Sequence, residues 1–235
     1  MTVLMHTWFM TVRHLRALMR QPWWIAISLV QPITYLLLYG QVFSRIVELP
    51  GFHAPNYVTY VTPGIVIMMA LFGGGWNGMG IIAEIDRGVM DRFLVAPVSR
   101  AAIIAGRLVQ MSIITVVQAA MMLGLGWVLG ARFEGGFTGL AVLMLCAVLV
   151  ALPFGALSNA MALVIRRQES VIGASNFILL PMTFLSPWSV ETARSALSAH
   201  ADWRLIGTRL VWLAALGLAS AWLAARAFRS YQKSI

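Results

Sequence analysis

Apolar segments long enough to cross a lipid bilayer fill most of this chain, and no other sequence feature limits its fold so strongly. Hydrophobic residues make up 60% of the 235 residues and charged residues only 11%, and the mean hydropathy is +0.83. Soluble domains are far less apolar, so the composition indicates an integral membrane protein. At about 20 residues for each helical crossing, six spans and their connections use nearly the whole chain and leave no room for a separate soluble domain.

Charged residues and stretches rich in proline and glycine divide the apolar sequence into six parts. We therefore predict an all-α membrane protein in which residues 1–235 form a single transmembrane domain. Residues 186–203 are predicted as an outer segment between the last two spans. The six predicted spans cover approximately residues 23–43, 57–83, 108–130, 137–165, 170–185 and 205–225.

The first 21 residues differ from the spans because they carry regularly spaced positive charge. Their apolar side chains recur at helical spacing, while Arg13, Arg16 and Arg20 fall largely on the other side of the helix. A basic amphipathic helix of this kind is typical of a segment that lies in the cytoplasmic interface with its apolar side toward lipid. We predict an interfacial helix over residues 1–21, which is either a simple membrane anchor or a support for a partner.

The distribution of positive charge predicts the orientation in the membrane. With six spans and both termini in the cytoplasm, the 17 lysine and arginine residues divide into twelve inside and five outside. An excess of positive charge in the inner connections is the usual arrangement. The five predicted outer residues are Arg45, Arg132, Arg194, Arg204 and Arg209.

Several classes of function lack the residues that they need. The net charge of +9 is accounted for by arginines flanking the spans, so we expect no nucleic-acid partner. Lys233 is the only lysine and lies in the tail, which excludes a phosphate-binding G-x-x-x-x-G-K-[ST] loop within this chain. The four histidines stand apart, and Cys146 is the only cysteine, so we expect no catalytic residue and no metal site. No charged residue falls in the middle of a predicted span, which disfavours a transporter driven by protons or sodium.

The longest charged interruption is the stretch 84–100, EIDRGVMDRFLVAPVSR. Apolar segments flank it on both sides, so it must lie in water at one face of the membrane. It combines acidic, basic and apolar side chains, which suits the docking of a partner, although a solvated surface loop is the plainer interpretation.

This stretch is similar to the E-R-E-x-G-T-x-E-x-L-L-V-T-P-x-S-R segment of ABC transporter permeases of the second type, which include the daunorubicin-resistance and nodulation-type export permeases. The Gln31-Pro32 pair in the first span and residues 180–186 also resemble that family. The residues that fit the segment are Glu84, Asp86, Gly88, Asp91, Arg92, Leu94, Val95, Pro97, Ser99 and Arg100.

The resemblance implies an export permease powered by a separate subunit. Two permease subunits, identical or related, would pair with two cytoplasmic ATPase subunits that bind ATP and Mg²⁺, so no cofactor is expected in this chain. Residues 84–100 would form the cytoplasmic coupling loop, seated in a cleft of the ATPase. The residues assigned to coupling are Glu84, Asp86, Arg87, Gly88, Asp91, Arg92, Phe93, Leu94, Pro97 and Arg100.

The cargo implied is an amphipathic or hydrophobic molecule, either a drug-like natural product or a lipid, because the spans lack charge. One region departs from the family, since the outer segment before the last span is about twenty residues shorter than usual. Two alternatives therefore stay open. The chain is a passive channel or pore, or it is a membrane protein that binds the ATPase and transports nothing.

Overall fold

The computed structural model describes residues 3–19, 23–48, 54–89, 100–185, 187–198 and 202–231. Every regular element within these ranges is helical, as the sequence predicts. The elements are α1 (Val3–Met19), α2 (Trp23–Val42), a short 3-10 helix η1 (Ser44–Glu48), α3 (Tyr57–Gly75), α4 (Met79–Asp86), α6 (Arg100–Val128), α7 (Gly136–Ile165), α8 (Gln168–Leu185), α9 (Pro187–Leu197) and α10 (Trp203–Tyr231).

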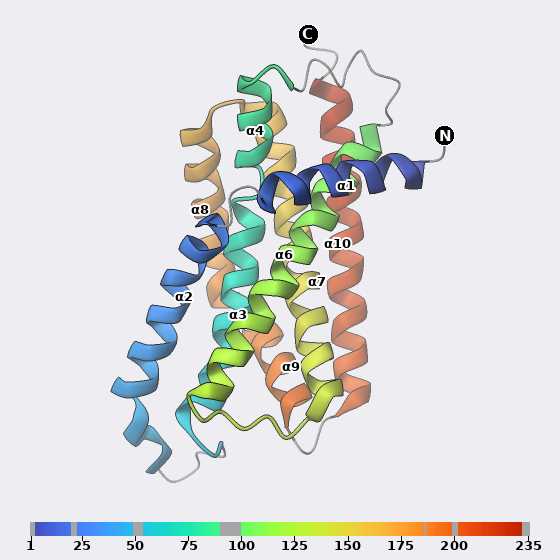
Figure 1. Cartoon of the computed structure of the whole chain (residues 1–235). Helices are drawn as coiled ribbons and strands as arrows, with labels where there is room; N and C mark the ends of the chain where they lie inside the picture. Colours follow the sequence, from blue (N-terminus) through green and yellow to red (C-terminus); the bar gives the residue numbers. More distant parts are fainter. Residues whose placement is uncertain are drawn as a thin grey trace.

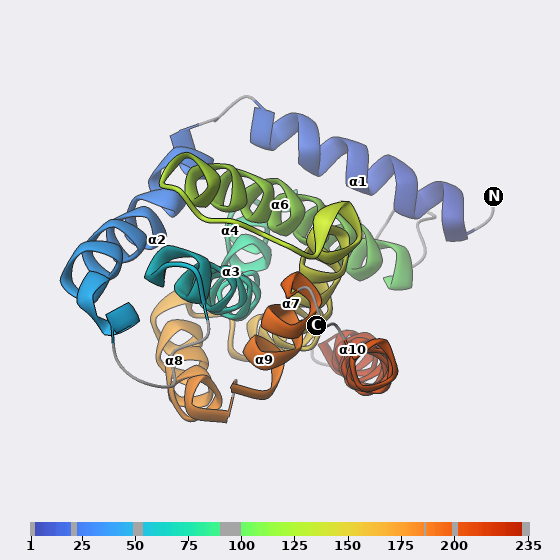
Figure 2. The same cartoon turned by 90° about the horizontal axis from the view of Figure 1, so that it is seen from below.

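The long helices run side by side as a bundle, and α1 lies across one end of it (Figure 1). α7 is the central helix and packs on α3, α6, α9 and α10, while α2 packs on α3 and α6 at the flank (Figure 2). The C-terminal end of α10, the α7–α8 turn and α4 lie at the same end as α1 (Figure 1). α1 and the end of α10 therefore share one side of the bundle.

Four helical stretches are long and apolar enough to cross a membrane among the described residues. They are Tyr57–Asp86, Ala102–Val128, Gly136–Ile165 and Trp203–Leu223, and Ala26–Val42 is a shorter apolar helix. Four of the six predicted spans overlap these stretches, and the count of six is not established. Their outer faces carry large exposed apolar side chains such as Trp212 and Leu218, as lipid contact requires.

Asn56 fixes the start of α3. Its side-chain oxygen accepts a hydrogen bond from the backbone N–H of Thr59 at 2.7 Å, which satisfies one of the unpaired donors in the first turn. Its amide nitrogen donates to the carbonyl of Gly130 at 2.6 Å, in the turn that follows α6. One residue thus caps α3 and ties it to the connection between α6 and α7.

Within the predicted outer segment 186–203, α9 forms a packed helix that the sequence pattern does not predict. α9 buries the side chains of Thr192, Ala193 and Ala196 completely against neighbouring helices. The backbone N–H of Gly135 donates to the carbonyl of Leu197 at 2.9 Å. Small side chains at helical spacing allow this close approach, and they give too weak an apolar pattern to predict a buried helix from sequence.

The second predicted span also differs from expectation. It breaks at residues 76–78 between α3 and α4, and the helix then continues to Asp86 instead of ending at residue 83. The first three residues of the predicted coupling loop 84–100 therefore belong to α4. This shift brings an acidic residue into the bundle.

Candidate functional site

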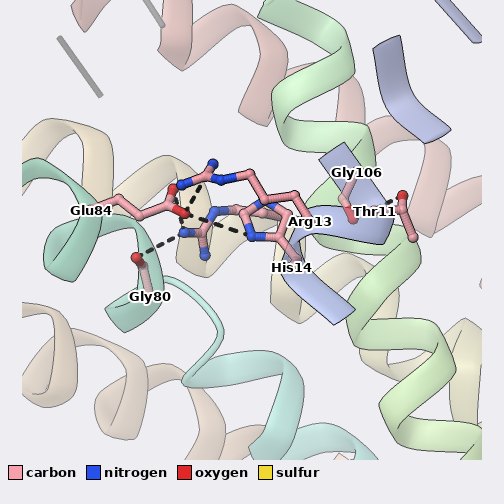
Figure 3. A network of polar contacts seen from close by, with 7 residues as sticks. Thr11, Arg13, His14, Gly80, Glu84 and Gly106 are labelled. Carbon is pink, nitrogen blue, oxygen red and sulfur yellow. Dashed lines mark hydrogen bonds and ion pairs between the residues drawn. The ribbon is translucent and has the colours of Figure 1, made fainter. Parts of the chain in front are cut away.

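Glu84 joins three helices at the end of the bundle crossed by α1. It lies in the last turn of α4, and its side chain is only 13% exposed. Its carboxylate lies 2.7 Å from Arg107 Nη2 on α6, 3.6 Å from His14 Nδ1 and 3.8 Å from Arg13 Nη1, both on α1 (Figure 3). Arg107 Nη2 also donates to the carbonyl of Gly80 at 2.8 Å, one turn earlier on α4. These five residues form what we call the Glu84 cluster.

Burial makes the pairing of Glu84 and Arg107 important for stability. The Arg107 side chain is 6% exposed, so neither charge can be fully hydrated. The distance between Arg107 Nη2 and Glu84 Oε2 is that of a hydrogen bond, but the geometry at the Glu84 oxygen does not meet that of one. The contact is therefore an ion pair. A buried charge that loses its partner is strongly destabilising. The pair therefore holds α4 and α6 in one relative position.

His14 contributes to the Glu84 cluster as a neutral side chain. Burial lowers the pKa of His14 from its ordinary 6.5 to about 4, and the positive charge of Arg107 acts in the same direction. The Glu84 carboxylate opposes this shift but does not overcome it. At pH 7 the charge of Glu84 is therefore balanced by the two arginines rather than by the imidazole.

α1 contacts α6 through a face that is partly polar. Met10, Thr11 and His14 are buried, whereas Trp8 is 65% exposed. The Thr11 hydroxyl donates to the carbonyl of Thr7 at 2.8 Å and lies 3.4 Å from the carbonyl of Gly106 on α6. A side chain at Gly106 would collide with Met10, so glycine permits the close approach of the two helices.

The break between α3 and α4 is itself held by polar contacts to α7. The backbone N–H of Gly78 donates to the hydroxyl of Ser158 at 3.0 Å, and the amide of Asn77 donates to Asn159 at 3.3 Å. Ser158 and Asn159 are both fully buried. α4 is therefore a short separate helix, attached to α7 at one end and to α1 and α6 through Glu84 at the other.

The predicted coupling residues that follow Glu84 fall into two groups: those that the structure describes and those that lie outside the described residues. Asp86 and Arg87 are exposed at the end of α4, and Gly88 follows with a φ of 64°, a left-handed conformation that favours glycine. Arg100 begins α6, and only its backbone placement is described. Asp91, Arg92, Phe93, Leu94 and Pro97 lie outside the described residues.

The predicted interfacial residues also fall into different environments. Arg13 is 44% exposed and contacts Glu84, whereas Arg16 is exposed and is not part of the Glu84 cluster. Arg20 lies outside the described residues. Sequence reasoning missed the roles of His14 and Arg107. The available signal is an arginine near the start of a long apolar helix, a pattern that by itself indicates only a charge that sets membrane orientation.

Long apolar helices without a strand among the described residues define a multi-pass helical membrane protein. The chain belongs to the ABC-2 type transporter family, whose profile matches residues 5–195. Members of this family are membrane subunits of transporters rather than catalytic enzymes. Within the described ranges, no group of three or more histidine, cysteine, aspartate or glutamate side chains is placed to hold a metal ion.

Curated relatives carry related names. The daunorubicin resistance ABC transporter permease protein DrrB1 of Streptomyces coeruleorubidus is 29% identical over 161 residues, which cover 67% of this chain and 54% of that protein. The putative transport permease ycf38 of Cyanophora paradoxa is 25% identical over 170 residues, covering 72% and 58%. The probable doxorubicin resistance ABC transporter permease protein DrrC of Mycobacterium tuberculosis is 25% identical over 170 residues, covering 68% and 61%. The chain thus spans less than two thirds of the length of these relatives.

Proposed function

We propose that this chain is the membrane-spanning subunit of an ATP-driven exporter. Two copies, or one copy and a related permease, pair with two cytoplasmic ATPase subunits, which hold the ATP and Mg²⁺. The cargo is an amphipathic or hydrophobic molecule, either a drug-like natural product or a lipid. Membership of the ABC-2 type transporter family and the names of the drug-resistance relatives support this proposal.

The observation that carries the proposal is the Glu84 cluster. The predicted coupling loop, residues 84–100, begins in the last turn of α4 and ends at the first residue of α6. A push on that segment reaches α4 and α6 together, because α6 begins at Arg100, and the ion pair of Glu84 with Arg107 makes the two helices move as one unit. Arg13 and His14 include α1 in the same unit. The geometry suits the transfer of force from a partner into several helices at once.

The proposed orientation has six spans and both termini in the cytoplasm. The end of the bundle that contains α1, α4 and the α7–α8 turn then faces the cytoplasm (Figure 1). Arg166 and Arg167 lie in that turn, while Arg132 and Arg194 lie toward the other end, in agreement with the usual excess of positive charge inside. On this basis α9 lies on the outer side.

The test is ATP-dependent uptake into inside-out membrane vesicles that contain the chain and an ABC ATPase subunit of the same organism. Uptake of a hydrophobic drug or fluorescent lipid that needs ATP hydrolysis, and that is lost in Arg107→Met with the ATPase still bound, supports the proposal. Conductance across a bilayer without any ATPase would favour the passive pore. Normal ATPase binding without movement of any tested cargo would favour a protein that transports nothing.

A further inference from the structure

A lateral cavity between α2, α3 and α6 has the features of a binding site for a small molecule. Its volume is about 320 Å³, at the lower end of the range for pockets that hold drug-sized ligands. Residues of α2, α3 and α6 line it, and these three helices pack together at the flank of the bundle (Figure 2). No residue of the Glu84 cluster lines it.

Two amide side chains line this cavity near the middle of largely apolar helices. Gln118 lies near the middle of the apolar stretch Ala102–Val128, and Gln31 lies near the middle of α2. Gln118 is eleven residues beyond Arg107 on α6, about 16 Å further along the helix axis. Polar groups at such a depth are costly unless they serve packing or a ligand.

The two amides have hydrogen-bonding capacity to spare. Gln118 Nε2 donates to the Ser28 hydroxyl at 2.7 Å, and Gln31 Nε2 donates to the Tyr35 hydroxyl at 3.0 Å. An amide can also donate a second hydrogen bond and accept through its oxygen. Neither Gln31 nor Gln118 makes a further hydrogen bond to the described residues, so each can bind a hydroxyl or a carbonyl group of a ligand.

The remaining lining favours a ring system without charge. Tyr35, Phe72 and Trp76 present aromatic rings to the cavity, and Met68 and Met69 add polarizable thioethers, which contact aromatic rings favourably. None of the lining residues is acidic, basic or histidine. A charged group would therefore enter without a counter-charge, which is costly in an apolar site.

Gly73 keeps the cavity open. A side chain at Gly74 would collide with the backbone of Ala151, and one at Gly75 would collide with Leu179, so packing requires those two glycines. A Cβ at Gly73 would meet nothing within 4 Å. Contacts with other helices therefore do not require a glycine at position 73. The absence of a side chain at Gly73 instead leaves space that forms part of the cavity.

We propose that this cavity binds an uncharged amphipathic molecule that has a flat aromatic part and hydroxyl or carbonyl groups. The rings lie among Tyr35, Phe72 and Trp76, and the polar groups bond to Gln31 and Gln118. A lipid acyl chain fits less well because it offers nothing to the two amides. The proposed binding depends on the cavity alone. The further statement that the bound molecule is the exported cargo rests on the function proposed above.

The test uses the whole chain in lipid nanodiscs, without ATPase or nucleotide. The probe is 4-(hydroxymethyl)benzophenone, which has two rings, a carbonyl and a hydroxyl, carries no charge, and forms a covalent adduct with nearby C–H groups under light. Mass spectrometry of peptides then locates the adduct. We expect labelling of Met68 and Met69 that saturates as the probe concentration rises.

Matched variants separate binding in the cavity from general partition into lipid. Gly73→Leu fills the cavity and should reduce the labelling at least fivefold, and Gln118→Leu should reduce it at least threefold. Gly124→Leu is the control, because Gly124 lies on the exposed side of α6, lines no part of the cavity and has room for a side chain. It should leave the labelling unchanged.

Three results would overturn the proposal. Labelling that never saturates and is as strong on the exposed face of α10 as in the cavity would mean partition into lipid only. A phospholipid retained in native mass spectra and lost in Gly73→Leu would mean that an acyl chain fills the cavity. Labelling that disappears as the chain dimerises would mean that a second copy covers it. Because no ATPase is present, failure of ATP-driven export would leave the binding result unaffected.

Discussion

Replacing Arg107 with methionine removes the closest ionic partner of Glu84 and keeps a long side chain in its place. The Glu84 carboxylate then retains Arg13 at 3.8 Å and His14 at 3.6 Å. His14 offers no charge at pH 7, because burial lowers its pKa to about 4. Removing one partner of a buried ion pair costs about 3–5 kcal/mol. Since Arg13 remains and the Glu84 side chain is 13% exposed, we expect a smaller loss of about 2 kcal/mol in the free energy of unfolding.

The companion variant Glu84→Gln leaves the Arg107 guanidinium unpaired, and its expected cost is also about 2 kcal/mol. The double variant leaves no unpaired charge from this pair. It should therefore lose about 2 kcal/mol in the free energy of unfolding, whereas two independent losses would sum to about 4 kcal/mol, and the difference is a coupling energy of about 2 kcal/mol. The assay is unfolding of the purified chain by SDS in mixed micelles, followed by circular dichroism.

Arg87→Met is the matched control for this experiment. Arg87 is exposed just after α4, so its loss should cost less than about 0.5 kcal/mol. A loss of unfolding free energy in the double variant that equals the sum of the two single losses would refute the reasoning. Such additivity is expected of independent residues and not of an ion pair. A loss at position 107 no larger than the loss at position 87 would refute it as well.

Three further predictions concern pH, close packing and capping. The free energy of unfolding should fall as the pH is lowered from 6.5 to about 4, because His14 is protonated at a higher pH in the unfolded chain than in the folded chain. The expected loss is on the order of 2–3 kcal/mol. The same pH titration of the variant His14→Gln should show no such loss. Gly74→Ala should destabilise the chain by about 1–3 kcal/mol in SDS unfolding, because its methyl group would lie 2.5 Å from the Ala151 carbonyl oxygen, whereas Gly73→Ala should be neutral or slightly stabilising. Asn56→Ala should cost about 1–2 kcal/mol and speed hydrogen exchange in the first turn of α3, and unchanged exchange there would contradict its capping role.

The helical class of the fold was predictable from sequence because lipid permits few alternatives. A chain that is 60% hydrophobic must satisfy its backbone hydrogen bonds internally, and helices do so within one segment. The start of α3 and both ends of α7 lie within one residue of the predicted limits. The break inside the second predicted span was not predicted, because the glycines at 73–75 indicate flexibility but do not locate a break.

α9 and the Glu84 cluster could not be predicted because both depend on contacts between distant parts of the chain. The helical period of α1 locates an apolar stripe, but it does not tell which side meets protein and which meets lipid. In this bundle Trp8 is exposed while His14 is buried. Arg107 has the same appearance in the sequence as any arginine beside a span, and only the packing of α6 on α4 gives it a partner.

The most direct test of the central proposal is co-purification of this chain with an ABC ATPase subunit of the same organism. We expect a stable complex in gentle detergent, lost when residues 93–97 are deleted and weakened by Phe93→Asp. Arg107→Met should still bind the ATPase and lose ATP-driven transport. If no complex forms, the proposed source of energy is contradicted. If the complex survives the deletion unchanged, the proposed route through the coupling loop is contradicted.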